Sequence, residues 1–205
     1  MGVALLHVKL KIWAGIGQQA TLWTTSRNKT LIARNFKHLW TGTNMKKIKL
    51  GGIIEHKDLS LISIENIPDR PGIAGLIFQT LSHRGINVEF IIHCLNRKGQ
   101  SQVILCVSKL KGEAALAVLS EIRSRIGAPE MFINSDIALL SIFGPHFRER
   151  PGIAGTFFGA LNSKGINIMA ISTSISTCSC VIPAADLPIA VKAVGEAFEV
   201  PGGEE

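Results

Sequence analysis

The chain has 205 residues, of which 46% are hydrophobic, enough to bury a core in one or two domains. Its formal net charge of +7 arises at the beginning of the chain, where residues 1–54 hold nine Lys and Arg and no acidic residue. The remaining 13 basic and 15 acidic residues give a net charge of −2, so we expect no nucleic-acid partner for this larger part.

The first 44 residues differ in composition from the rest, because they hold all three tryptophans and no acidic residue. Three interpretations of residues 1–44 stay open: translation begins at Met45 and the preceding segment is not native, the segment is an acid-poor transit peptide, or it is a small additional element. The apolar stretch at residues 3–16 contains a histidine and two lysines, so it is too short and too charged to span a membrane. We therefore expect no membrane partner.

Residues 45–135 carry the first recurring pattern. The sequence KIKLGGII at residues 47–54 has the length and composition of a strand. Proline suits the first turn of a helix, and glycine commonly ends one. The pattern then predicts strands at 58–67, 86–94, 102–107 and 131–134, a helix between the Pro71-Gly72 turn and Gly85, and a second helix at 113–126. From residue 58 onward this order is β-α-β-β-α-β, the ferredoxin-like plan.

The same pattern returns in residues 136–201. Residues 69–91 (DRPGIAGLIFQTLSHRGINVEFI) and 149–171 (ERPGIAGTFFGALNSKGINIMAI) are identical at 12 of 23 positions, at an offset of 80. A match of this density indicates a duplicated unit. The second copy predicts strands at 136–144, 166–174 and 178–182, a helix between the Pro151-Gly152 turn and Gly165, and a second helix at 187–198.

The second copy lacks a fourth strand, because the sequence after residue 198 is a short segment rich in Gly and Glu. The unused strand within residues 45–57 is the candidate to cross over and complete it. We therefore expect an α+β fold of two ferredoxin-like βαββαβ units. In this fold the first unit, residues 58–135, is inserted in the second unit, which consists of residues 45–57 and 136–201.

At these residues the chain resembles the paired ACT domains that form the regulatory half of aspartate kinases. The matching segments are GGIIEHKD at 51–58, IPDRPGIAG at 67–75, GINVEFI at 85–91, GINIMAISTS at 165–174 and AVGEAF at 193–198. The resemblance covers about residues 45–201. It implies an amino-acid-binding allosteric protein of aspartate-family biosynthesis, which senses a small amino acid such as threonine or lysine.

Nothing in the sequence matches the catalytic half of that family, which opens with a Lys-Phe-Gly-Gly motif, and there is no G-x-x-x-x-G-K phosphate loop. We therefore expect no catalytic residues and no kinase activity from the chain by itself. Three functions stay open: a free amino-acid sensor, a regulatory subunit or fragment of aspartate kinase, and a structural module with a degenerate site.

The cysteines and histidines predict no metal site, no cofactor and no nucleophilic catalysis, because their spacing fits none of these. Cys178 and Cys180 share one face of a predicted strand. We expect them, like Cys94 and Cys106, to be core or half-buried thiols. Unpaired thiols are typical of a reducing cytoplasm, which is the expected location.

The Pro-Gly turn is the chemical centre of each unit. It places backbone N–H groups at a helix start, where a carboxylate binds, and its glycine lets a ligand approach closely. Asp69 can pair with an ammonium group, and Asn87 can both donate and accept hydrogen bonds. These groups suit an α-amino acid, although the same residues also make an ordinary helix start.

Carried over position by position, the resemblance implies an effector site formed by Asp69, Gly72, Ile73, Ala74, Asn87, Val88 and His93, facing Asn167 and Ile168 of another unit. His93 stands where threonine-sensing members commonly have Gln, and Ile175 stands where many members have Glu. The ligand therefore stays open between threonine, lysine and another amino acid. We also expect a homodimer paired through sheet edges, with a separate kinase catalytic subunit as a further candidate partner.

Overall fold

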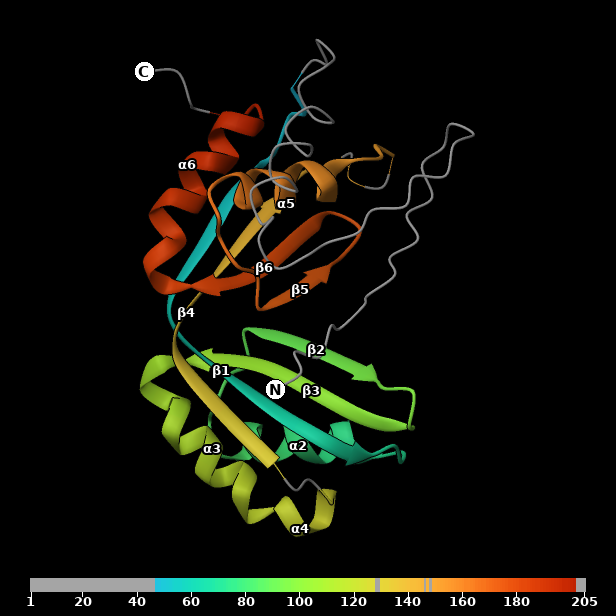
Figure 1. The fold of residues 1–205 in the computed structure, drawn as a ribbon. Coiled ribbons are helices and arrows are strands. Elements are labelled where there is room, and N and C mark those ends of the chain that lie inside the picture. The colour runs from blue at the N-terminus through green and yellow to red at the C-terminus, as the bar shows by residue number, and fades with distance from the viewer. Residues whose placement is uncertain (1–46, 128–129, 146, 148, 202–205) are drawn as a thin grey trace, which may run out of the picture. The chain divides into compact units, whose positions relative to one another are not determined.

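The computed structural model describes residues 47–127, 130–145, 147 and 149–201 (Figure 1). The three interpretations of residues 1–44 therefore concern a segment outside the described residues. The described elements, in chain order, are β1 (Gly52–Pro68), α2 (Ile73–His83), β2 (Phe90–Leu95), β3 (Gln100–Ser108), η1 (Lys109–Lys111), α3 (Gly112–Glu121), α4 (Arg123–Ile126), β4 (Glu130–Phe143), α5 (Ile153–Ser163), β5 (Ala170–Thr173), β6 (Thr177–Pro183), η2 (Ala184–Asp186) and α6 (Leu187–Ala197).

The described strands form one antiparallel sheet in the order β2-β3-β1-β4-β6-β5. Figure 1 shows β1 in cyan and β4 in gold as the two long strands at its centre. The beginning of β1 pairs with the end of β4, and Gly52 lies opposite Phe143. The end of β1 pairs with the beginning of β4, and Glu65 lies opposite Glu130. Each long strand therefore contributes one half to each unit.

This pairing confirms the expected α+β fold, in which the first ferredoxin-like unit is inserted in the second. The first unit has the strand order β2-β3-β1-β4, and the second has β1-β4-β6-β5. The residue boundaries expected for the units, 45–57, 58–135 and 136–201, stay a prediction. Both long strands cross those boundaries, and the chain from Lys47 onward groups as one unit.

The structure joins strands that the sequence pattern separated. β1 unites the last residues, 52–54, of the strand predicted at 47–54 with the strand predicted at 58–67, and β4 unites those predicted at 131–134 and 136–144. In β1 the junction is Asp58, whose φ of 55° lies at a register shift between His56 and Leu59. Aspartate tolerates this left-handed region better than most residues, and such a bulge bends a strand without ending its ladder.

The second strand of each unit begins later than predicted, at Phe90 and Ala170 instead of residues 86 and 166. The backbone of Ile86 is used to close the preceding helix, because its N–H donates to the Leu81 carbonyl at 3.0 Å. Ile166 makes the same bond to Leu161 at 3.2 Å. These apolar residues therefore belong to the helix end, although their composition suits a strand.

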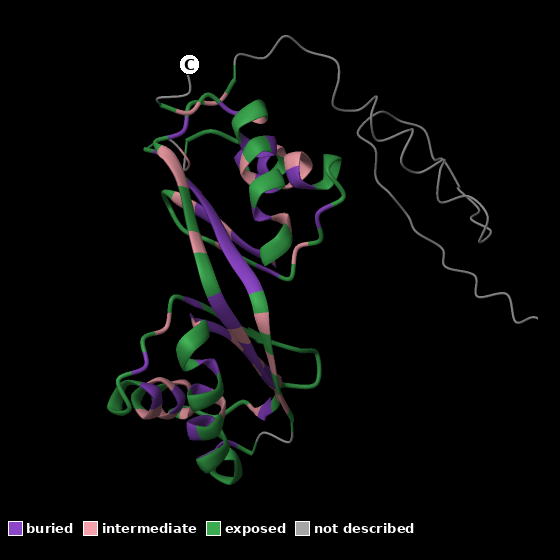
Figure 2. Cartoon of the chain, turned by 90° about the vertical axis from the view of Figure 1, so that its left-hand side faces the viewer, coloured by how far each residue is buried: buried purple, intermediate pink, exposed green. Residues whose placement is uncertain are grey.

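Helices cover one face of each unit, with α2 and α3 on the first and α5 and α6 on the second (Figure 1). Side chains alternate between the faces of a strand, so Leu140 joins the core under α5 and α6 while Leu139 points to the opposite face. On that opposite face both units share a third apolar cluster. It consists of Leu59, Phe90, Cys106, Ile137, Leu139, Ala170 and Val181. Figure 2 shows buried residues along part of each long strand and exposed or intermediate residues along the rest.

The segment before β1 belongs to the second unit's core. Leu50 is 4% exposed and packs in the same cluster as Phe198. The Leu50 N–H donates to the Glu199 carbonyl at 2.9 Å, and the Glu199 N–H donates to the Ile48 carbonyl at 3.0 Å. Residues that precede the first unit therefore pair with residues that follow the last helix.

Leu50→Ala should lower the free energy of unfolding by about 2–5 kcal/mol, because it leaves a cavity between elements from the two ends of the chain. Leu110→Ala is the matched control, since Leu110 is 94% exposed and its loss should change stability by less than about 0.5 kcal/mol. Denaturant melts of both variants measure the difference. Equal stability of the two variants would mean that the crossing segment contributes no core.

The four cysteines are all free, and three of them are buried. The prediction of buried thiols is confirmed for Cys106, Cys178 and Cys180. It is wrong for Cys94, which is exposed next to the end of the edge strand β2. Burial raises the pKa of Cys106 to about 12 and of Cys178 to about 11. Burial, together with the charge of Cys178, raises the pKa of Cys180 to about 12.

Iodoacetamide at about pH 8.5, near the ordinary thiol pKa, should therefore modify only Cys94 in the folded protein, and all four cysteines in urea. Mass spectrometry counts the adducts, and rapid labelling of a second cysteine without urea would contradict the burial.

The raised pKa values of the three buried thiols also stabilise the folded state in which these thiols are protonated. The free energy of unfolding should thus fall as the pH rises from about 8.5 toward 11–12.

Candidate functional site

The Pro-Gly turn begins helix α2 with an unusual backbone. Gly72 has a φ of 94°, in the left-handed region that favours glycine, and its carbonyl accepts the Leu76 N–H at 2.9 Å. No side chain caps this helix, and its first turn contains no acidic residue. The helix N-terminus therefore keeps backbone N–H groups and a partial positive charge that can bind an anionic group.

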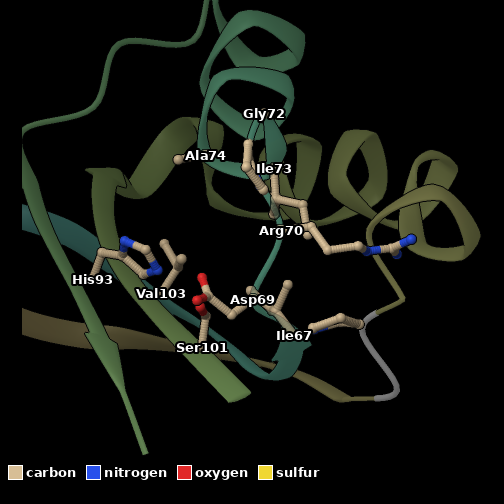
Figure 3. A pocket seen from close by; sticks show the side chains of 11 residues that line it. Ile67, Asp69, Arg70, Gly72, Ile73, Ala74, His93, Ser101 and Val103 are labelled. Carbon is tan, nitrogen blue, oxygen red and sulfur yellow. The ribbon is translucent and has the colours of Figure 1, made fainter. Parts of the chain in front are cut away.

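A cavity of about 310 Å³ lies beside this turn, between the start of α2 and strands β2 and β3 (Figure 3). Five of the nine site residues expected from the sequence line it. They are Asp69, Gly72, Ile73, Ala74 and His93. Figure 3 shows the Asp69 carboxylate close to Ser101 and the His93 ring beside Val103, while the end of the Arg70 side chain points away from both. The cavity therefore brings one carboxylate and one imidazole to the helix start.

Strand pairing supplies the lining residues that sequence reasoning missed on β3, Ser101 and Val103. Val103 lies opposite His93 on β2, and Ser101 lies opposite Ile67 on β1. The signal that could have found them is the short loop between β2 and β3, because a hairpin loop fixes which residues are opposite each other. Arg70 and Pro71 of the turn, together with Ile67 and Pro68 before it, also line the cavity.

The other four expected residues lie outside this cavity. The Asn87 side chain is exposed and donates from Nδ2 to Glu89 Oε1 at 2.8 Å, and Val88 packs against the first unit's core. Asn167 is exposed, and Ile168 packs against the second unit's core. They occupy the same positions in the second unit as Asn87 and Val88 in the first, 80 residues later. A single chain therefore does not bring all nine residues to one cavity.

The second Pro-Gly turn repeats the backbone of the first with different side chains. Gly152 has a φ of 95° and begins α5, again without a side-chain cap. Glu149 replaces Asp69, and Thr173 stands 80 residues after His93. The two turns are therefore alike in conformation but differ in the groups that a ligand would meet.

A family model for the ACT domain matches residues 140–198, so the second unit is an ACT domain. The ligand-free regulatory subunit of aspartate kinase from Thermus thermophilus is 36% identical, with a TM-score of 0.67, over 73% of this chain and 99% of that chain. The regulatory subunit from Thermus flavus is 35% identical, with a TM-score of 0.68, over 75% and 100%. This chain belongs to the family of ACT-domain regulatory regions of aspartate kinases.

The curated relatives are longer than the region of them that this chain matches. The aspartokinase of Thermus thermophilus is 36% identical over 149 residues, which are 72% of this chain and 36% of the relative. The aspartokinase of Mycolicibacterium smegmatis is 29% identical over 163 residues, 78% of this chain and 39% of the relative. The chain thus spans about two fifths of the length of the curated relatives that it matches. Among the described residues, no helix is long and apolar enough to cross a membrane.

We expect the turn to require glycine at position 72, because residues other than glycine rarely adopt a φ of 94°. An added Cβ at Gly72 would meet no atom within 4 Å, so the cost of a substitution there comes from the backbone conformation alone. Gly72→Ala should lower the free energy of unfolding by about 1–2 kcal/mol. Gly75→Ala is the matched control. Gly75 lies inside α2 with equally open space and an ordinary φ, so alanine there should stabilise by about 0.5–1 kcal/mol. Thermal or denaturant melts measure both changes, and equal effects at the two positions would contradict the turn's strain.

Proposed function

We propose that the cavity beside Gly72 binds an α-amino acid as an allosteric effector. This proposal rests on one observation: a cavity large enough for a small ligand is lined by a negatively charged side chain and by the partly positive start of a helix. The Asp69 carboxylate lines the cavity that also contains the uncapped start of α2. An α-amino acid offers an ammonium group for the carboxylate and a carboxylate for the helix N-terminus.

The rest of the effector site would come from a second copy of the chain. Asn87 and Val88 lie just before β2, and Asn167 and Ile168 lie just before β5. Among the described strands, β2 and β5 are the two outer strands of the sheet, and they touch each other without pairing in the ladder, so each has an edge without a hydrogen-bonded neighbour. Ile91 and Ile171, 43% and 42% exposed, lie on these edges. A homodimer through these edges would place the second unit of one chain beside the first unit of its partner.

The chain would act on a separately encoded catalytic chain of aspartate kinase. Its alignment covers nearly the whole of the two Thermus regulatory subunits, which supports a role as a regulatory subunit over that of a free sensor. A solved structure described as the alpha and beta subunits of aspartokinase is 28% identical, with a TM-score of 0.66, over 72% of this chain and 97% of that chain. The exposed free thiol of Cys94 favours the reducing cytoplasm as the location.

The purified chain should show no kinase activity by itself, because the sequence contains no phosphate loop and no catalytic segment of the family. Coupled ADP release in the presence of ATP, Mg²⁺ and aspartate measures this. Turnover that follows the protein through purification and persists after removal of contaminants would refute the regulatory assignment.

A thermal-shift screen of the twenty amino acids identifies the effector, and calorimetry then tests the turn. Asp69→Ala should weaken binding about tenfold to a hundredfold, because charge-assisted hydrogen bonds contribute about 1.5–3 kcal/mol. Glu149→Ala makes the matching change in the second unit and should weaken binding less. Denaturant melts without ligand separate lost binding from lost stability. If Asp69→Ala binds as tightly as the parent protein, the turn is only a helix start.

A further inference from the structure

A second cavity, of about 340 Å³, lies on the sheet face opposite the helices and shares no lining residue with the cavity beside Gly72. We call it the hydroxyl groove. Residues of both units line it. Glu89 and Phe90 belong to the first unit, and strands β4, β5 and β6 of the second unit supply most of the other lining residues. β2 and β5 contact each other beside it. Strands hold its side chains more rigidly than loops would.

Hydroxyl groups form one end of the groove. Ser141, Ser179 and Ser172 lie directly opposite one another on β4, β6 and β5. The Oγ atoms of Ser141 and Ser179 are 2.7 Å apart and share a hydrogen bond, and Ser141 is 5% exposed. The hydroxyls of Ser172 and Thr177, both half-buried, make no hydrogen bond to any residue of the described chain. They are free to bind a polar ligand.

The carboxylate of Glu89 lines the other end. Glu89 Oε1 accepts the Asn87 Nδ2 hydrogen at 2.8 Å, and Glu89 Oε2 lies 4.0 Å from His56 Nδ1. His56 lies opposite Leu139, two residues along β4 from Ser141, so His56 is offset from the serine row by about 7 Å along the strand direction. The buried side chains of Leu139 and Phe90 form an apolar floor between them.

We infer that the hydroxyl groove is a second small-molecule site, which takes a zwitterionic α-amino acid. The negative charge of Glu89 disfavours a simple anion and attracts an ammonium group. The hydroxyls at the opposite end donate to a carboxylate. This site does not depend on occupancy of the cavity beside Gly72.

NMR titration of the full-length, ¹⁵N-labelled chain with each of the twenty L-amino acids tests the inference. At least one amino acid should shift the amide signals of Ser172 and Ser179 saturably, and should do so equally in Asp69→Ala. Signals of Gly72 and Ile73 report the other cavity in the same spectra, so failure of either site is seen separately. If no amino acid shifts the signals of Ser172 and Ser179 saturably, the inference is overturned. This holds also if a second copy of the chain covers the groove.

Two groove variants complete the test. Glu89→Gln should weaken this binding about tenfold to a hundredfold, and Ser172→Ala, which breaks no internal hydrogen bond, about twofold to tenfold. Glu121→Gln makes the same charge change on α3, where Glu121 pairs with Arg84 at 2.9 Å, and should leave groove binding unchanged. Shifts at Ser172 that disappear in Asp69→Ala, or that persist unweakened in Glu89→Gln, show propagation from the other cavity and overturn the inference.

Discussion

The antiparallel ladder between β1 and β4 is the interaction on which the rest of the structure depends. Each strand gives one half to each unit, so neither four-stranded sheet is complete without both strands. A sheet that lost one of these halves would expose the backbone groups of its neighbour and one side of a helix-covered core. The ladder therefore makes the two units fold as partners, and the apolar cluster around Leu59 and Leu139 reinforces this on the face away from the helices.

Both ligand-sized cavities take their positions from this ladder. β1 ends at Pro68, immediately before the turn that starts α2, and its residue Ile67 pairs with Ser101 in the cavity wall. The hydroxyl groove uses the opposite half of β1, through His56, and the second half of β4. A ligand in either cavity thus contacts a strand that continues into the other unit. We propose that this shared strand couples binding in either cavity to the arrangement of the two units.

Duplication has preserved backbone conformation and changed chemistry. The two turns keep the same left-handed glycine, with φ values of 94° at Gly72 and 95° at Gly152, because each helix start requires it. The side chains near those turns have diverged, from Asp69 to Glu149 and from His93 to Thr173. The same backbone can therefore support different ligand affinities in the two units.

The sequence by itself determined the repeat, the α+β class, the inserted order of the units and the turn residues at Asp69 and Gly72, because these depend on local periodicity, turn chemistry and the count of strands. Only the tertiary structure decided that β1 and β4 are continuous, since a strand can pass a bulge such as Asp58 when a neighbouring ladder holds it on both sides. It also decided that Ser101 and Val103 line the cavity, and that Ser172 lies across from Ser179. Cross-strand neighbours are set by register between segments distant in sequence, and no local pattern records that register.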